Sequence, residues 1–201
     1  MKHVIITRFN YDREDKFNER FVIFTQTLLP SLLNQTNKNF TWCLICENKT
    51  HREIIKSLYN NDIMFVDNLS QAMKFVKDNH IHIQTRQDND DMICENYIQT
   101  IHDEVNKTDK DVLLIQFQPT KINYKTKEEF HMEERYGNNF VSMFLSLYQK
   151  NVTRTVHDYM HPEMYKLTQN IITYPEGCAK MVVHGGNMSN KLNPNDILVK
   201  K

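Results

Sequence analysis

Apolar and polar positions along the first 117 residues follow two alternating periods. Short runs rich in β-branched residues and bounded by polar residues predict strands buried on both faces. These runs lie at 3–10, 40–46, 63–67, 81–87 and 111–117. Between them, apolar residues recur at helical spacing, which predicts helices near 18–34, 50–59 and 70–76, and one after position 91 with a shared apolar face of Ile93, Tyr97, Ile101 and Val105. This alternation predicts an α/β fold, with a mostly parallel sheet flanked by helices and right-handed crossovers.

Local signals refine the ends of these helices. Pro30 lies inside the first helical pattern and predicts a kink there. Thr50 and Glu53 have the spacing of a capping box, and Ser70 is expected to cap the next helix.

The pattern changes after Thr120. A small antiparallel hairpin is expected over 121–132 and a short final strand over 181–183. Pro162 suits the first turn of a helix within 155–167. A helix is expected over 138–149, where the apolar residues would be buried: Phe140, Phe144, Leu145 and Tyr148.

The composition limits the kinds of partner that the protein is expected to bind. The 25 basic and 25 acidic residues balance and are interspersed, so the basic patch typical of a nucleic-acid-binding protein is not evident. No apolar run approaches the about 20 residues that cross a bilayer, and the first 20 residues lack the pattern of a secretory signal. We therefore expect no nucleic-acid partner, no transmembrane segment and a cytoplasmic location.

The four cysteines are expected to be reduced core residues. Cys43 and Cys46 have CxxC spacing, but they lie in a predicted strand, where residues three apart point to opposite faces and cannot share a metal ion. Cys94 and Cys178 stand alone in the sequence.

An acidic cluster follows the fourth predicted strand directly, as Asp88, Asn89, Asp90 and Asp91. Ligands of parallel sheets bind at the carboxyl ends of the strands, which is where this cluster would lie. Carboxylates this close repel unless a cation or hydrogen bonds compensate them. Two interpretations remain open: the acids cap the next helix, or they hold Mg²⁺ or Mn²⁺ together with substrate phosphates.

The segment from Thr85 to Asp91 resembles the DxD element of GT-A glycosyltransferases. More narrowly, it is similar to the R-x-D-N-D-D stretch of the rhamnosyltransferase-like family, as are the segments 6–10, 142–147 and 183–187, in the expected order. The resemblance implies a single GT-A-like domain over 1–201. Residues 1–117 would form its nucleotide-binding half and 118–201 the acceptor-side half that completes the metal site.

The same resemblance implies roles for individual residues. A divalent Mn²⁺ or Mg²⁺ would bridge the diphosphate of a nucleotide-sugar donor, held by Asp90, Asp91 and His184, although Asp91 could instead orient Asp90. Donor contacts would come from the strand ends, with Asp88 on the sugar or ribose and Arg86 near the phosphates. The other donor contacts would be Arg8, Asn10, Glu47 and Asp67, of which the two acids could equally be helix caps.

A general base is required if the reaction inverts the anomeric centre. His157 and Asp158 are the candidates, with Glu133 and Glu134 as further possibilities. A retaining enzyme needs no such base.

The resulting hypothesis is a metal-dependent glycosyltransferase that moves a sugar to a hydroxyl of a glycan or protein acceptor. The same acidic cluster would also suit a metal-dependent phosphoryl-transfer enzyme, such as a nuclease or nucleotidyltransferase. A non-catalytic sugar- or nucleotide-binding module is the third possibility.

Overall fold

The computed structural model describes residues 1–9, 14–58, 63–132, 144–158, 161–184, 192 and 196–199. Its strands are β1 (His3–Arg8), β2 (Thr41–Ile45), β3 (Ile63–Val66), β4 (Ile83–Asp88), β5 (Met92–Ile93), β6 (Val112–Asn123), β7 (Glu129–His131), β8 (Leu145–Gln149), β9 (Ile171–Val183) and β10 (Ile197–Leu198). Its α-helices are α1 (Phe17–Gln26), α2 (Leu28–Leu33), α3 (Lys49–Leu58), α4 (Leu69–Asp78) and α5 (Tyr97–Lys107). Two 3₁₀ helices complete the described elements, η1 (Glu14–Lys16) and η2 (His161–Lys166).

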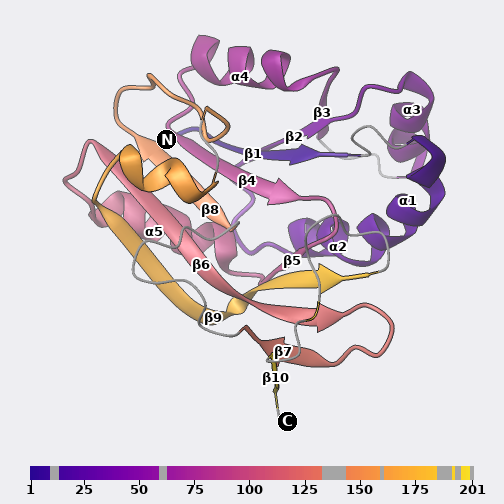
Figure 1. Cartoon of the computed structure of the whole chain (residues 1–201). Coiled ribbons are helices and arrows are strands. Elements are labelled where there is room, and N and C mark those ends of the chain that lie inside the picture. The colour runs from indigo at the N-terminus through magenta and orange to yellow at the C-terminus, as the bar shows by residue number, and fades with distance from the viewer. Residues whose placement is uncertain are drawn as a thin grey trace.

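A parallel group of strands, in the order β3-β2-β1-β4, forms one side of the sheet. The sequence pattern predicted each of these strands, and Val4, Ile5 and Ile6 in β1 are almost fully buried, as expected for a strand covered on both faces. Figure 1 shows α4 above this group, α2 below it, α5 at the lower left and α1 to the right, on the side toward which β1 and β4 point. The α/β fold with parallel core strands flanked by helices is confirmed, whereas the described sheet as a whole is mixed, because β5, β7, β8 and β10 pair antiparallel.

Two hydrophobic cores lie on the two faces of the sheet. Ala72 and Val76 of α4 pack in one core, and Phe24 of α1 and Ile101 of α5 pack in the other. Cys43 of β2 and Cys46, which follows β2 directly, divide between these cores: Cys43 belongs to the first and Cys46 to the second. The prediction that they cannot share a metal ion is thus confirmed.

The strand β8 corrects the sequence prediction of a helix over 138–149. Leu145–Gln149 forms a strand that runs antiparallel between β4 and β6. Leu145 and Leu147 face one core, while Ser146 between them hydrogen-bonds to Thr85 of β4. The helical interpretation failed because this short apolar run fits a buried strand as well as a helix. Phe140 lies outside the described residues.

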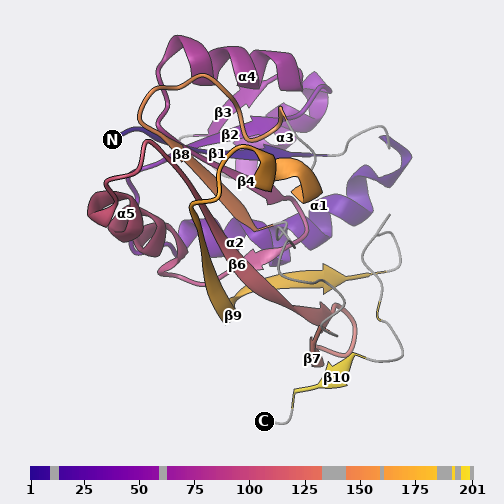
Figure 2. The same ribbon diagram turned by 60° about the vertical axis from the view of Figure 1, so that its left-hand side comes forward.

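The last part of the sheet is built by β6, β7, β9 and β10. The hairpin expected over 121–132 is present, with β6 and β7 antiparallel. The final strand expected at 181–183 is the end of the much longer β9, which pairs in parallel with β6 through an irregularity between Phe117 and Pro119. Figures 1 and 2 show β6 and β9 side by side, extending away from the parallel group toward the C-terminus.

Helix boundaries differ from expectation in three places. The kink predicted from Pro30 is a break at Thr27 between α1 and α2, which places Pro30 in the first turn of α2, where a proline is tolerated. Asn side chains cap the next two helices: Asn48 accepts from the His51 N–H and Asn68 from the Gln71 N–H. The expected caps at Thr50 and Ser70 are therefore wrong, by two residues each.

Cys94 and Cys178 form a disulfide, which corrects the expectation that all four cysteines are reduced. The antiparallel pairing of β5 with β9 places the two residues opposite each other, with a Cα–Cα distance of 4.7 Å. Cys43 and Cys46 are free and buried, as expected. None of the described helices is long and apolar enough to cross a membrane.

Candidate active site at the carboxyl ends of β1 and β4

The parallel register of β1 and β4 places Arg8 opposite Asp88 at the end of both strands. Arg86 lies two residues before Asp88, so its side chain emerges on the same face of β4, and its Nε is 3.9 Å from Asp88 Oδ1. Burial lowers the pKa of Arg86, and the nearby positive charge of Arg8 adds to this effect. Two sequence-predicted donor contacts and Asp88 are thus brought together.

Asp88 is close to both negatively and positively charged side chains. Burial raises its pKa, and so does the charge of Asp90, whereas Arg86, Arg8 and Arg20 lower it. Its side chain is still 34% exposed, so the carboxylate can reach a ligand.

The acidic cluster does not cap a helix. Asn89 and Asp90 form a turn after β4, Met92 and Ile93 form the short strand β5, and α5 begins only at Tyr97. The capping interpretation of the acidic cluster is therefore wrong, as is the placement of Ile93 on the helix.

Asp91 anchors the acidic turn to β9. Its side chain is buried, and Oδ1 accepts a hydrogen bond of 3.0 Å from the Val182 N–H. Burial raises the pKa of Asp91 well above its ordinary value, and the charges of Asp90 and Asp88 add to the shift, while the Val182 bond opposes it. Of the two roles that the resemblance allowed, this geometry favours orientation of the turn over direct metal binding.

His184 meets Asp90 across the sheet, with 3.0 Å between His184 Nε2 and Asp90 Oδ2. The histidine is the residue that follows the last one of β9, so the pairing of β9 with β5 and β6 carries it to the acidic turn. The His184 side chain is 6% exposed and that of Asp90 is 21% exposed. Two of the residues that the resemblance assigns to the metal ion are thus brought together, and their role as its ligands stays a prediction.

The donor set fits a hard cation that is partly held by its substrate. Among the described residues, no three His, Cys, Asp or Glu side chains converge to hold a metal ion by themselves. Mg²⁺ is commonly bound through one or two carboxylates with the remaining positions filled by water and substrate phosphates, so Asp90 with His184 suffices as a protein contribution. The buried Asn89 Nδ2 has no hydrogen-bond partner within the described part of the chain, and as an N–H donor it suits a phosphate oxygen of the substrate rather than the cation itself.

The remaining predicted donor contacts are more dispersed. Glu47 is exposed just after β2. Asp67 is engaged by protein groups, because Oδ1 accepts from Arg52 at 2.6 Å and Oδ2 from Gln71 at 2.8 Å. These bonds lower the pKa of Asp67, that from Gln71 most strongly. Asn10 lies outside the described residues, as do Glu133 and Glu134.

The candidate bases lie in a turn beside the beginning of β4. Asp158 Oδ2 accepts from the Thr155 N–H at 2.7 Å, and the Val156 N–H donates to Gln84 Oε1 at 2.9 Å. Gln84 precedes Asp88 by four residues in the same strand, so this turn adjoins the opposite end of β4 from the acidic cluster. The assignment of His157 or Asp158 as general base stays a prediction.

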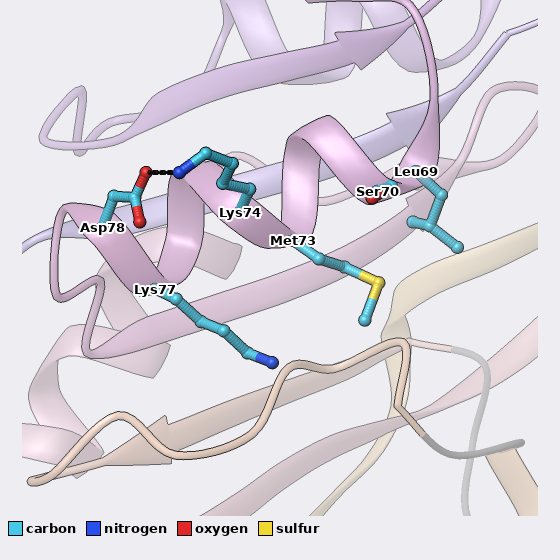
Figure 3. A pocket seen from close by; sticks show the side chains of 6 residues that line it. All are labelled: Leu69, Ser70, Met73, Lys74, Lys77 and Asp78. Atoms are coloured by element: carbon cyan, nitrogen blue, oxygen red, sulfur yellow. Dashed lines mark hydrogen bonds and ion pairs between the residues drawn. The ribbon is translucent and has the colours of Figure 1, made fainter.

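A separate hollow of about 510 Å³ lies along α4. Figure 3 shows Met73 and Lys77 projecting from the helix, while Lys74 turns to Asp78 in an ion pair of 2.6 Å. Its lining contains none of the acidic-cluster residues, so it is distinct from the candidate site.

Two arginines were missed by sequence reasoning. Arg20 of α1 acts electrostatically on Asp88, and Arg52 of α3 ties Asp67 to the end of β2 through the Cys46 carbonyl oxygen. A signal for Arg20 was present, because it is three residues after Phe17 and four before Phe24 on the apolar face of its helix.

Comparison with solved structures finds chains of similar fold. S. aureus TarS 1-349 in complex with UDP-GlcNAc matches with a TM-score of 0.62 and 12% identity, over 96% of this chain and 62% of that one. A second S. aureus TarS structure matches with a TM-score of 0.57 and 12% identity, over 91% of this chain and 37% of that one. A cytidylyltransferase from Leptospira borgpetersenii serovar Hardjo-bovis matches with a TM-score of 0.50 and 13% identity, over 88% of this chain and 76% of that one. This chain therefore spans less than two thirds of either TarS structure, and at these identities the likeness shows the fold alone.

Among curated proteins, none matches the sequence. The family model described as "Putative rhamnosyl transferase" matches residues 6–196, which is nearly the whole chain and includes the acidic cluster and His184. With the GT-A-like fold of TarS, this match is in accord with the resemblance carried by the R-x-D-N-D-D stretch. The chain belongs to this rhamnosyl transferase family of glycosyltransferases.

Proposed function

We propose that this protein transfers a sugar from a nucleoside-diphosphate donor to an acceptor hydroxyl, with Mn²⁺ or Mg²⁺ bridging the diphosphate. The observation that carries the proposal is the contact between Asp90 and His184 beside Asp88, at the strand ends where sheets of this kind bind ligands. A carboxylate, an imidazole and a second carboxylate there form a donor set for a divalent cation.

The reaction explains the charges at the site. Departure of the nucleoside diphosphate concentrates negative charge on its phosphate oxygens, and a bound divalent cation would neutralise that charge. Arg8 and Arg86 lie at the same edge and would bind the phosphates directly. Asp88, partly exposed, is placed to accept a hydrogen bond from a hydroxyl of the donor sugar or ribose.

The His184 ring is held in position by Asp90, and Asp91 fixes the turn that carries Asp90. The turn therefore need not reorganise when the donor binds. Such preorganisation accounts for a large share of electrostatic catalysis.

The donor base and the acceptor are the finer part of the proposal. TarS has been solved with UDP-GlcNAc, so uridine nucleotides are the first to test, followed by guanosine, thymidine and cytidine nucleotides. A hydroxyl of a glycan or protein is the proposed acceptor. If transfer inverts the anomeric centre, His157 or Asp158 is the proposed base, which requires the turn next to Gln84 to approach the acceptor.

The deciding experiment is calorimetric binding of UDP, GDP, dTDP and CDP, each with and without Mn²⁺, to the wild type and Asp90→Asn. We expect one diphosphate to bind the wild type only when Mn²⁺ is present. Asp90→Asn should lose this Mn²⁺-dependent binding. Asp109→Asn is the matched control, because Asp109 is an exposed acid whose ion pair with Lys110 lies away from the acidic turn. Binding of no diphosphate, with or without the metal, would contradict the proposal.

A further inference from the structure

Arg20 lies on the buried face of α1. Phe17 and Phe24 flank it at helical spacing, and both are buried. Both rings contact Phe9, with centroid distances of 5.8 Å for Phe17 and 5.1 Å for Phe24. Phe9 follows Arg8 directly, so the face of α1 that carries Arg20 packs over the carboxyl end of β1.

The arrangement of elements places α1 at the ligand-binding edge of the sheet. In Figures 1 and 2, β1 and β4 point toward the side of the molecule on which α1 lies. Arg8 ends β1 and pairs in register with Asp88 at the end of β4. A guanidinium on the inner face of α1 therefore faces the same edge from a third element.

Arginine side chains approach this edge from three elements, because Arg8 ends β1, Arg86 lies in β4 and Arg20 lies on the inner face of α1. Arg86 Nε is 3.9 Å from Asp88 Oδ1, and Arg8 is the register partner of Asp88. Asp90 follows Asp88 by two residues and contacts His184. Within the described part of the chain, Arg20 is half-buried and makes no hydrogen bond or ion pair of its own. Its guanidinium donors are therefore available to an anion that binds at this edge.

We propose that Arg20 is a phosphate-binding residue that holds the diphosphate of the nucleotide donor, together with Arg8 and Arg86. This inference rests on the proposed function for the identity of the anion. A guanidinium suits the role because it stays charged, and its fork of donors can bind two phosphate oxygens at once. Lysine at the same place would supply charge without that bidentate geometry.

The competing role for Arg20 is purely structural: it would only neutralise Asp88 and support α1. The two roles differ in their dependence on phosphate. A residue that binds phosphate contributes nothing to the affinity for the nucleoside, and it contributes progressively more to the affinity for the monophosphate and the diphosphate. A structural residue affects all three alike, or shifts only the thermal stability.

The experiment is a binding ladder of nucleoside, nucleoside monophosphate, nucleoside diphosphate and inorganic pyrophosphate, measured by calorimetry on the wild type, Arg20→Gln and Arg20→Lys. For Arg20→Gln we expect about tenfold weaker binding of the diphosphate and of pyrophosphate, with nucleoside affinity unchanged. Arg20→Lys should recover part of the loss. Arg154→Gln is the matched control. This exposed arginine lies beside the beginning of β4, where its backbone carbonyl oxygen accepts from Gln84 and Gln149 and its backbone N–H donates to Gln149.

The outcomes separate this inference from the proposed function. Equal affinity of Arg20→Gln and wild type for the diphosphate, or an equal loss for nucleoside and diphosphate, overturns the role of Arg20 while leaving the glycosyltransferase proposal standing. If the wild type binds pyrophosphate through Arg20 but binds no nucleotide, the anion site stands and the nucleotide-sugar donor does not. If the wild type binds neither, both proposals are wrong.

Discussion

His184 Nε2 lies 3.0 Å from Asp90 Oδ2, although 94 positions separate the two residues in the chain. The contact exists because β9 pairs with both β5 and β6. In addition, Val182, two residues before His184, donates its N–H to Asp91, the neighbour of Asp90. The acidic turn and the end of β9 are therefore one structural unit. A substitution in the acidic turn should therefore alter the end of β9, and a substitution at the end of β9 should alter the acidic turn.

Loss of His184 should weaken metal binding. Replacing His184 by Ala removes the imidazole next to Asp90 and should reduce Mn²⁺ affinity by at least about tenfold, measured by calorimetry in the presence of the diphosphate that binds best. His131→Asn is a matched control, because His131 of β7 also pairs with a carboxylate, that of Glu176, at an exposed position. Unchanged Mn²⁺ affinity in His184→Ala would remove His184 from the metal site.

Asp91 should be more important for stability than for chemistry. Asp91→Ala removes the hydrogen bond that Asp91 Oδ1 accepts from the buried Val182 N–H, so the free energy of unfolding should fall by about 1–3 kcal/mol. Asp91→Asn keeps an acceptor oxygen in nearly the same volume and should lose much less. Chemical denaturation of the two variants checks this, and an equal loss in both would show that the charge of Asp91, rather than its hydrogen bond, is what the fold requires.

The Cys94–Cys178 disulfide should be detectable by counting thiols. Alkylation of the unfolded, unreduced protein should modify two cysteines, Cys43 and Cys46, and prior reduction should raise the number to four by mass spectrometry. The double variant Cys94→Ser/Cys178→Ser should be less stable by about 2–4 kcal/mol, because the bond closes a long loop. Four modified cysteines without reductant would mean that the pair is reduced, as the sequence and a cytoplasmic location suggested.

The parallel half of the sheet could be predicted because local pattern determines it. Runs such as Val4-Ile5-Ile6 are buried on both faces, and no other element explains them equally well. By contrast, Leu145–Gln149 was assigned to a helix because its strand character depends on β4 and β6, which bracket it in space and lie far away in sequence. The length of β9 likewise depends on its pairing with β6.

The site divided in the same way. Asp88 to Asp91 were found by their position after a strand, and His184 came from the family resemblance, since nothing local distinguishes a histidine before two glycines. Arg20 and the disulfide were missed because each depends on a tertiary contact: α1 packing over Phe9, and β5 pairing with β9. The choice between a helix cap and a ligand site required the position of α5, whose first residue is Tyr97.

A buried histidine pair should make the stability of the protein sensitive to acid. His3 Nδ1 lies 3.1 Å from His102 Nε2, and His3 Nε2 lies 2.8 Å from Thr85 Oγ1. Burial, with a smaller contribution from the charge of His102, lowers the pKa of His3 to about 3 from its ordinary 6.5. Burial, and after it the charge of the N-terminal amino group, lower the pKa of His102, whereas Asp103 of α5 raises it.

The sign follows from proton uptake. Between pH 6.5 and about 3 the unfolded chain binds a proton at His3 that the folded protein excludes, so stability is lost as the pH falls through this window and is unaffected above it. The slope approaches about 1.4 kcal/mol per pH unit, so the wild type should lose about 2 kcal/mol between pH 7.5 and pH 5 through His3 alone. In urea denaturation at the two pH values, His3→Asn should remove most of this loss, whereas His80→Asn, at an exposed histidine, should retain it. Parallel losses in the wild type and His3→Asn would show that His3 is not excluded from protonation in the folded state, and that the acid sensitivity arises elsewhere.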